Sequence, residues 1–191
     1  MSGTTQDVGT QHKIVLHVGC GAYNPNKLHQ RFNRDEWQEI RLDIDPNVKP
    51  DILGDITNMA DVADASVDAV WSSHNIEHLY PHQVEIAFKE FYRVLKPGGF
   101  VFLTLPDLQA VAKHVAEGNL EEPLYVSPAG PISAIDILFG FRPSLAAGNY
   151  FMAHKTGFTA RTMAQKLENT GFKEVKVQSV KLDLWAVGYK L

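Results

Sequence analysis

Short apolar runs that stop at glycine, proline or acidic residues recur through the first half of the chain. Such runs are typical of buried strands in a parallel sheet, because these strands carry apolar side chains on both faces. Turn-forming residues and carboxylates follow the runs, as at Gly19, Asp45 and Gly54. The pattern predicts five strands, at residues 14–18, 40–44, 51–53, 67–71 and 100–105.

Between the fourth and fifth strands, apolar residues recur every three or four positions, which predicts a helix with one apolar face. These residues are Val84, Ala87, Phe88, Phe91, Val94 and Leu95. A helix between two strands implies that the strands are parallel and joined by a right-handed crossover. We therefore expect an α/β fold with a doubly wound, mostly parallel seven-stranded sheet of the Rossmann-like type. Its ligand crevice would lie at the carboxyl ends of the strands.

The pattern changes after residue 106. We expect a short helix at residues 108–117, a proline-rich turn at 123–131 and an apolar piece at 132–141. Regular structure then resumes with a helix at 160–169, which has Thr159 as N-cap and Gly171 just beyond its end. Two further strands, at 175–180 and 184–189, are close enough to form an antiparallel hairpin.

These elements predict a single domain in four parts. The parts are a flexible tail at residues 1–12, a cofactor-binding core at 13–105, a helical cap insert at 106–156, and a closing helix and hairpin at 157–191.

Composition narrows the class of protein. Apolar residues make up 45% of the 191 residues and charged residues 21%, which is the balance of a globular domain. With 18 basic and 22 acidic residues the net charge is −4, so a nucleic-acid partner is not expected. A single cysteine, Cys20, excludes an internal disulfide. A polar first dozen residues and the absence of any run of about 18 apolar residues predict a cytoplasmic protein without a membrane partner.

The first strand leads into a glycine bend, which favours a bound ligand. Gly19 and Gly21 let a ligand approach the backbone, and Asn24 with Pro25 predicts the start of a short helix. Asp43 follows about 20 residues later at the end of the adjacent strand, where a carboxylate can bind a ribose diol. Asp45 is the alternative ribose ligand, although its place before Pro46 also suits a turn cap.

Several motifs occur in an order that resembles the class I S-adenosylmethionine-dependent methyltransferases. Between residues 13 and 106 they are Val18-Gly19-Cys20-Gly21, Leu42-Asp43-Ile44-Asp45-Pro46, Gly54-Asp55-Ile56, Ile76-Glu77-His78-Leu79 and Arg93-Val94-Leu95-Lys96-Pro97-Gly98-Gly99. The resemblance resumes at Gly157-Phe158-Thr159 and Thr170-Gly171-Phe172. A dinucleotide-binding fingerprint would instead need a third glycine at the position that holds Asn24.

The resemblance implies S-adenosylmethionine as cofactor, with S-adenosylhomocysteine as its product, and a set of binding residues. Val18, Gly19, Cys20 and Gly21 would border the methionine moiety, and Asp43 would hold the ribose. Ile44, Asp55 and Ile56 would contact adenine, and Ser73 and His74 would border the cofactor at the end of the fourth strand. The chain departs from many family members at His17, where they have an acid, and at Tyr23, where they have a third glycine.

Methyl transfer is an in-line displacement, so the protein mainly aligns the acceptor and removes a proton where this is needed. His74 and His154 are the candidate catalytic residues. His74 has a structural cap as its alternative role, and Glu77 and His78 are expected to satisfy loop amides. No metal is expected, because none of the eight histidines lies in a metalloprotease helix motif.

The methyl acceptor is the partner that the sequence leaves unidentified, and we expect it to be small or medium-sized. The insert would set its identity, with Tyr125, Phe139, Phe141, Arg142 and Tyr150 as possible contacts. Apolar pieces of the insert could equally cover a homodimer interface. A catalytically silent S-adenosylmethionine-binding regulatory module and a nicotinamide-dependent oxidoreductase are the alternative functions.

Overall fold

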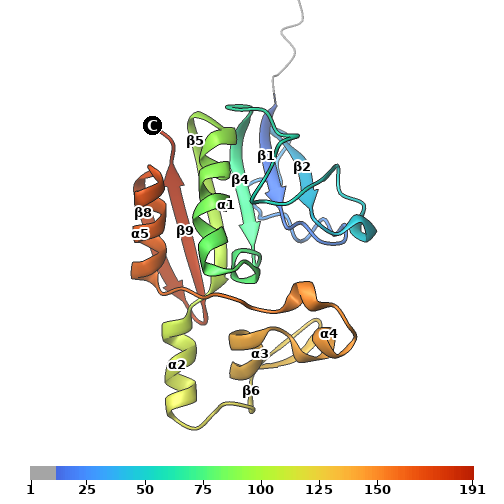
Figure 1. Cartoon of the computed structure of the whole chain (residues 1–191), viewed down its shortest axis with the longest axis vertical. Coiled ribbons are helices and arrows are strands. Elements are labelled where there is room, and N and C mark those ends of the chain that lie inside the picture. Colours follow the sequence, from blue (N-terminus) through green and yellow to red (C-terminus); the bar gives the residue numbers. More distant parts are fainter. Residues whose placement is uncertain (1–11) are drawn as a thin grey trace, which may run out of the picture.

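The computed structural model describes residues 12–191, so the flexible tail predicted at residues 1–12 lies outside the described residues except for His12. The view in Figure 1 shows one sheet with helices packed against it, and a smaller group of helices and strands below the carboxyl ends of β1, β2 and β4.

The main sheet has seven strands in the order β3-β2-β1-β4-β5-β9-β8. The first five pair in parallel, and β9 pairs antiparallel with β5 and β8. The predicted fold class and the closing hairpin are therefore confirmed. The strands are β1 (Lys13–Val18), β2 (Trp37–Asp43), β3 (Ile52–Leu53), β4 (Val67–Ser73), β5 (Leu95–Pro106), β8 (Lys173–Val180) and β9 (Asp183–Tyr189).

Two strands differ most from the prediction in their bounds. The second strand starts at Trp37 and stops at Asp43, so Ile44 lies beyond its end and is half exposed. The fifth strand starts at Leu95, because the segment before Phe100 already pairs with Val67 of β4. Both extensions come from pairing between strands, which a local sequence pattern does not encode.

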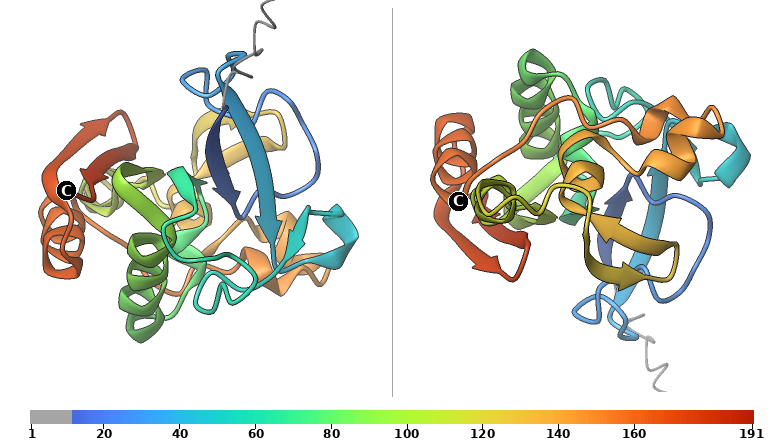
Figure 2. Two further views of the ribbon diagram at one scale, coloured as in Figure 1. Left: turned by 90° about the horizontal axis from the view of Figure 1, so that it is seen from above. Right: turned by 90° about the horizontal axis from the view of Figure 1, so that it is seen from below.

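Helices α1 (Pro81–Val94) and α5 (Ala160–Thr170) cover the same face of the sheet, as Figure 2 shows in its left view. The predicted apolar stripe of α1 is buried here: Val84, Ala87 and Phe88 have no exposed surface. The predicted caps of α5 are also present, because the Thr159 side chain accepts a hydrogen bond from the amide of Thr162 and Gly171 has a φ of 117°.

The opposite face of the sheet is covered by the crossover loop, which we define as residues 19–36. Phe32 of this loop is buried against Val15, Trp71 and Phe100. The short helix predicted to start at Asn24 and Pro25 is wrong, because the segment forms consecutive turns instead. The Asn24 side chain accepts a hydrogen bond from the amide of Asn26, and this local bond competes with helix formation.

The insert, which we define as residues 106–156, packs around a small core of its own formed by Val111, Ala134 and Ile137. The proline-rich turn predicted at residues 123–131 is wrong, because this segment forms most of a two-stranded hairpin. Pro123 and Pro131 are tolerated there because both strands are edge strands. The elements of the insert are α2 (Leu108–Ala116), β6 (Pro123–Ser127), β7 (Gly130–Ser133), α3 (Ala134–Phe139) and α4 (Arg142–Ala146). Among residues 12–191, no helix has the length and apolar character needed to cross a bilayer.

An ion pair between the buried Asp136 and the half-exposed Arg142 fixes the start of α3 and predicts how the insert responds to acid. Asp136 accepts hydrogen bonds from Ser133 and from the guanidinium of Arg142, with 2.8 Å between its Oδ1 and Arg142 Nε. Burial raises the pKa of Asp136, but these donors outweigh it and hold the pKa well below its usual range. This contribution to stability is complete at neutral pH and is lost as the pH falls below about 4, the value of an unpaired aspartate.

We therefore expect Asp136→Asn to lower the free energy of unfolding by about 1–3 kcal/mol at pH 7, because buried donors lose a charged acceptor. Urea denaturation should show that the difference from wild type shrinks toward pH 3. Asp61→Asn, at an exposed position, is the control and should change stability by less than about 0.5 kcal/mol. A difference that stays constant with pH would contradict this assignment.

Candidate active site

A cavity of about 670 Å³ lies at the carboxyl ends of β1, β2 and β4 and is closed on one side by residues of the insert. Its size suits a nucleoside-sized ligand. Nine of the ten predicted cofactor-binding residues line it, namely Gly19, Cys20, Gly21, Asp43, Ile44, Asp55, Ile56, Ser73 and His74. Val18, the tenth, has no exposed surface and lies beneath the bend.

The glycine bend needs its glycines for conformation and for space. Gly19 and Gly21 have φ values of 62° and 60°, in the left-handed region that side chains disfavour. A Cβ at Gly19 would overlap the carboxamide of Asn75, and a Cβ at Gly21 would lie 2.7 Å from the Nζ of Lys27. The side chains of Asn75 and Lys27 therefore lie against the glycine bend, a contact that the sequence did not predict.

Asp43 points at the bend, as its predicted role requires. Its Oδ2 accepts a hydrogen bond of 2.7 Å from the amide of Gly21, and its Oδ1 accepts one from the amide of Asp45. Each carboxylate oxygen has a further lone pair that can accept a hydrogen bond from a ligand hydroxyl. Asp45 instead caps the turn that starts at Pro46, because its Oδ1 accepts a hydrogen bond from the amide of Asn47.

The far end of the cavity has the features of a site for a flat base. Ile44 is half exposed there and Ile56 is nearly buried. The Oδ1 of Asp55 accepts hydrogen bonds from the amide and hydroxyl of Thr57, which fixes the carboxylate at the cavity wall. An apolar surface beside a fixed acceptor can bind a ring that carries an amino group.

The other end of the cavity lies around Asn75 and Lys27. His17 is buried and its Nδ1 lies 2.6 Å from the Oε1 of Glu39, so an acid from β2 approaches the position where family members carry their own acid. The Nδ2 of Asn75 is buried and donates no hydrogen bond to any residue in the described range 12–191. With the ammonium group of Lys27, it can bind an anionic group.

Cys20 also lines the cavity, but its thiol is unreactive at neutral pH. Burial raises the pKa of Cys20 to about 11, and the nearby Arg41 offsets only part of this effect. Because the thiolate is the nucleophilic form, Cys20 cannot form a covalent intermediate efficiently near pH 7.

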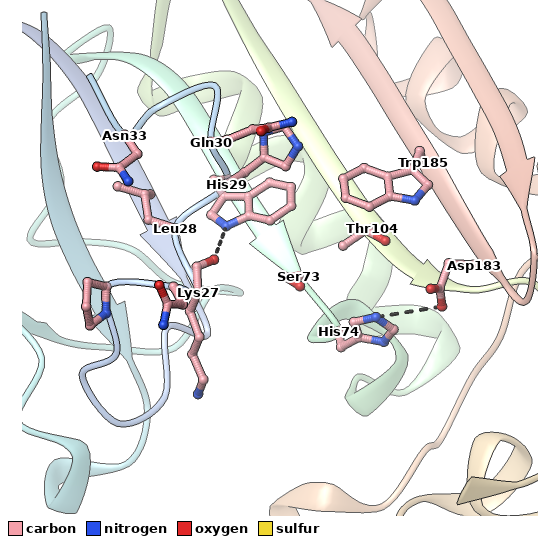
Figure 3. A pocket seen from close by; sticks show the side chains of 13 residues that line it. Lys27, Leu28, His29, Gln30, Asn33, Ser73, His74, Thr104, Asp183 and Trp185 are labelled. Atoms are coloured by element: carbon pink, nitrogen blue, oxygen red, sulfur yellow. Dashed lines mark hydrogen bonds and ion pairs between the residues drawn. The ribbon is translucent and has the colours of Figure 1, made fainter. Parts of the chain in front are cut away.

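A second cavity, of about 490 Å³, adjoins the first and shares Asn26, Lys27, Ser73 and His74 with it. Figure 3 shows His29 and Trp185 on one side of this cavity and His74 below them. Trp71 and Trp185 are nearly parallel, with ring centroids 6.1 Å apart, and the ring of His29 lies within 5.5 Å of both. The second cavity therefore has aromatic rings on one part of its wall, among mainly polar lining residues.

His74 lies where the two cavities meet. Its φ of 47° places a non-glycine residue in the left-handed region, a strained conformation that is concentrated at functional sites. Its Nδ1 lies 3.4 Å from Glu77 and its Nε2 lies 3.7 Å from Asp183, as the dashed line in Figure 3 marks for the latter pair. Burial lowers the pKa of His74, but the two carboxylates outweigh it and hold the pKa above its ordinary value.

The remaining predicted polar residues gather behind His74. Glu77 was expected to satisfy loop amides, but this is wrong: its carboxylate is buried and no backbone amide of residues 12–191 donates to it. His78 does bond a loop, because its Nδ1 lies 3.1 Å from the carbonyl of Ala153. His154 packs against His78 and lines neither cavity.

Four residues of the insert that were not among the predicted contacts line the first cavity. They are Asn149, Phe151, Met152 and Lys155. The five residues named as possible substrate contacts line neither cavity: they are Tyr125, Phe139, Phe141, Arg142 and Tyr150. Residue type alone does not show which of two neighbouring aromatic residues in a loop faces a cavity. Tyr150 was predicted to contact the substrate, but its neighbour Phe151 lines the cavity.

Comparison with known proteins gives a consistent result. Residues 16–103 match the family described as the methyltransferase domain, and no curated protein matches the chain. A SAM dependent methyltransferase from Archaeoglobus fulgidus has a TM-score of 0.61 at 15% identity, covering 95% of this chain and 87% of that one. A possible histamine N-methyltransferase from Thermotoga maritima has a TM-score of 0.58 at 18% identity, covering 93% and 82%.

A further structural neighbour is longer. Phosphoethanolamine N-methyltransferase 2 of Haemonchus contortus, in complex with S-adenosyl-L-methionine, has a TM-score of 0.55 at 17% identity. The similarity covers 89% of this chain and 35% of that chain. At these identities the structural comparisons establish the fold.

Proposed function

We propose that this chain, whose residues 16–103 match the methyltransferase domain family, is an S-adenosylmethionine-dependent methyltransferase that methylates a small aromatic acceptor. The single observation that carries the proposal is the meeting of the two cavities at His74, one of nucleoside size and one smaller, with Trp185 and His29 among its lining residues. A methyl group held at their junction would face an acceptor in the smaller cavity.

The residues of the larger cavity fit S-adenosylmethionine. Asp43 would hold the ribose hydroxyls, and Ile44, Asp55 and Ile56 would contact adenine. Gly19 and Gly21 form a cradle that a Cβ would fill, and the unpartnered Nδ2 of Asn75 with the Lys27 ammonium would bind the carboxylate end. When bound, the sulfonium supplies an electrophilic methyl group, and the electron pair of the broken carbon–sulfur bond stays on sulfur.

The residues of the smaller cavity support an aromatic or heteroaromatic amine or phenol as acceptor. Trp185 and His29, which are partly exposed, offer ring faces for stacking, and the buried Trp71 supports them. The Thr104 hydroxyl, which is buried without a partner among residues 12–191, and the carboxylate of Asp183 are the polar groups that could orient the nucleophile. His74 would take the proton of the acceptor as its lone pair attacks the methyl group.

The proposed function is tested first by ligand binding. We expect calorimetry to show binding of S-adenosylmethionine and S-adenosylhomocysteine, with NAD at least about tenfold weaker, equivalent to roughly 1.4 kcal/mol. The physical reason is that the bend lacks the third glycine of the dinucleotide fingerprint, which lets the following helix pack closely on the strand and place its N-terminus at the pyrophosphate. Preferential binding of NAD would reject the proposal in favour of an oxidoreductase.

The nature of the acceptor is tested by following labelled methyl groups from S-adenosylmethionine into a cell extract depleted of its own small-molecule cofactors. Label in the small-molecule fraction supports an acceptor that fits the smaller cavity. Label confined to macromolecules would contradict the small aromatic acceptor, and no label in either fraction would favour a silent binding module.

A further inference from the structure

A buried carboxylate that accepts no hydrogen bond, with His74 as its ion-pair partner, lies behind the junction of the two cavities. Glu77 is 1% exposed, and neither of its carboxylate oxygens accepts a hydrogen bond from residues 12–191. The nearest contact, with the Nδ1 of His74 at 3.4 Å, is not aligned as a hydrogen bond. A buried carboxylate in this state is costly unless a charge or a metal compensates it.

Two histidines near Glu77 each have their Nδ1 atom hydrogen-bonded to a backbone carbonyl. The Nδ1 of His78 lies 3.1 Å from the carbonyl of Ala153, and the Nδ1 of His154 lies 2.7 Å from the carbonyl of Ile137. Since a carbonyl can only accept, each Nδ1 carries the hydrogen and each Nε2 keeps a free lone pair in the neutral ring. Metal-binding histidines are oriented in this way, with the second nitrogen donating to a carbonyl or carboxylate.

The three side chains converge. One ligand atom of each of Glu77, His78 and His154 lies within 4.8 Å of the others, and the two imidazole rings are 4.9 Å apart. Two imidazoles and one carboxylate form the protein ligand set of many zinc sites that keep a fourth position for water.

We infer that Glu77, His78 and His154 form a binding site for one divalent transition-metal ion of the zinc class. The ion would compensate the Glu77 carboxylate and use the two free Nε2 lone pairs. Imidazole ligands favour zinc, copper, iron and nickel over magnesium and calcium. A local histidine motif could not reveal this site, because His78 and His154 are far apart in the sequence and meet only through the insert.

The proposed site would also join the insert to the sheet. Glu77 and His78 lie in the turn that follows β4, and the backbone oxygen of Glu77 accepts hydrogen bonds from Lys155 and Thr156. His154 belongs to the insert, as do the carbonyls that orient both rings. An ion shared by the two parts would therefore hold the insert in its position over the first cavity.

The inference is tested by titrating the chelator-treated full chain with Zn²⁺ in competition with a chromophoric chelator, without S-adenosylmethionine. We expect one tight Zn²⁺ per chain and no competition from millimolar Mg²⁺. His154→Gln and Glu77→Gln should each weaken binding at least tenfold, because each removes one ligand. His82→Gln is the matched control, since His82 is exposed and lies only four residues after His78, and it should bind Zn²⁺ as the wild type does.

Two outcomes overturn the inference: no stoichiometric Zn²⁺ binding by the wild type, or equal affinity in wild type and His154→Gln. If the variants fail to fold, Co²⁺ substitution in the wild type decides. Intense visible absorption supports a tetrahedral site of low coordination, and the weak spectrum of an octahedral, water-bound ion rejects it. Because the assay contains no methyl donor, its failure would leave the proposed methyl transfer untouched.

Discussion

Replacing Asp43 with alanine is expected to weaken S-adenosylmethionine binding about a hundredfold. The carboxylate is placed to accept two charged hydrogen bonds from the ribose, each worth about 1.5 kcal/mol or more. The same carboxylate also accepts a hydrogen bond from the amide of Gly21, so the substitution would also loosen the glycine bend. Calorimetry of a variant that keeps the wild-type circular dichroism spectrum measures the effect.

Asp45→Ala is the matched control for this result. Asp45 lines the same cavity, but its side chain caps the turn at Pro46. We expect it to cost about 1 kcal/mol of stability, as the loss of a helix N-cap does, and to leave the affinity within about threefold. A larger loss of affinity in Asp45→Ala than in Asp43→Ala would transfer the ribose contact to Asp45.

Replacing His74 with alanine is expected to slow methyl transfer between about a hundredfold and ten-thousandfold, the usual contribution of a positioned base. The measurement is the initial rate at which the extract's acceptor is labelled, with S-adenosylmethionine saturating. His74 lies at the junction of the cavities rather than around the ribose, so the affinity for S-adenosylmethionine should change little.

His114→Ala provides the comparison, because this histidine is on α2 and lines neither cavity. It should keep the wild-type rate. If His74→Ala labels the acceptor as fast as His114→Ala does, then proton removal is not a function of His74, and its strained backbone needs another explanation.

The side of the cavity lined by Asp43 and Asp55 could be predicted from the sequence because strand ends determine it. Once the apolar runs fix β1 and β2 as neighbours in a parallel sheet, Gly21 and Asp43 must meet at the same edge. The same reasoning places Asp55 and His74 along that edge. Parallel pairing of neighbouring strands therefore predicts which strand-end residues lie close together.

The rest of the site depends on contacts that no local pattern encodes. Lys27 reaches Gly21 because the crossover loop forms turns rather than a helix, and Asn75 covers Gly19 from the turn after β4. His154 meets His78 only because the insert folds back under the strand ends. In each case the partner comes from an irregular segment, where residue type and spacing carry little information about distance.

The crossover loop has a consequence for how this protein can vary. Surface loops usually tolerate added residues at small thermodynamic cost. This loop cannot, because Phe32 anchors it to an otherwise uncovered face of the sheet while Asn26 and Lys27 form walls of both cavities. An insertion between Lys27 and Phe32 would move Lys27 relative to the buried Phe32 and so change the shape of both cavities. We therefore expect relatives to conserve the length of the crossover loop more strictly than its residues.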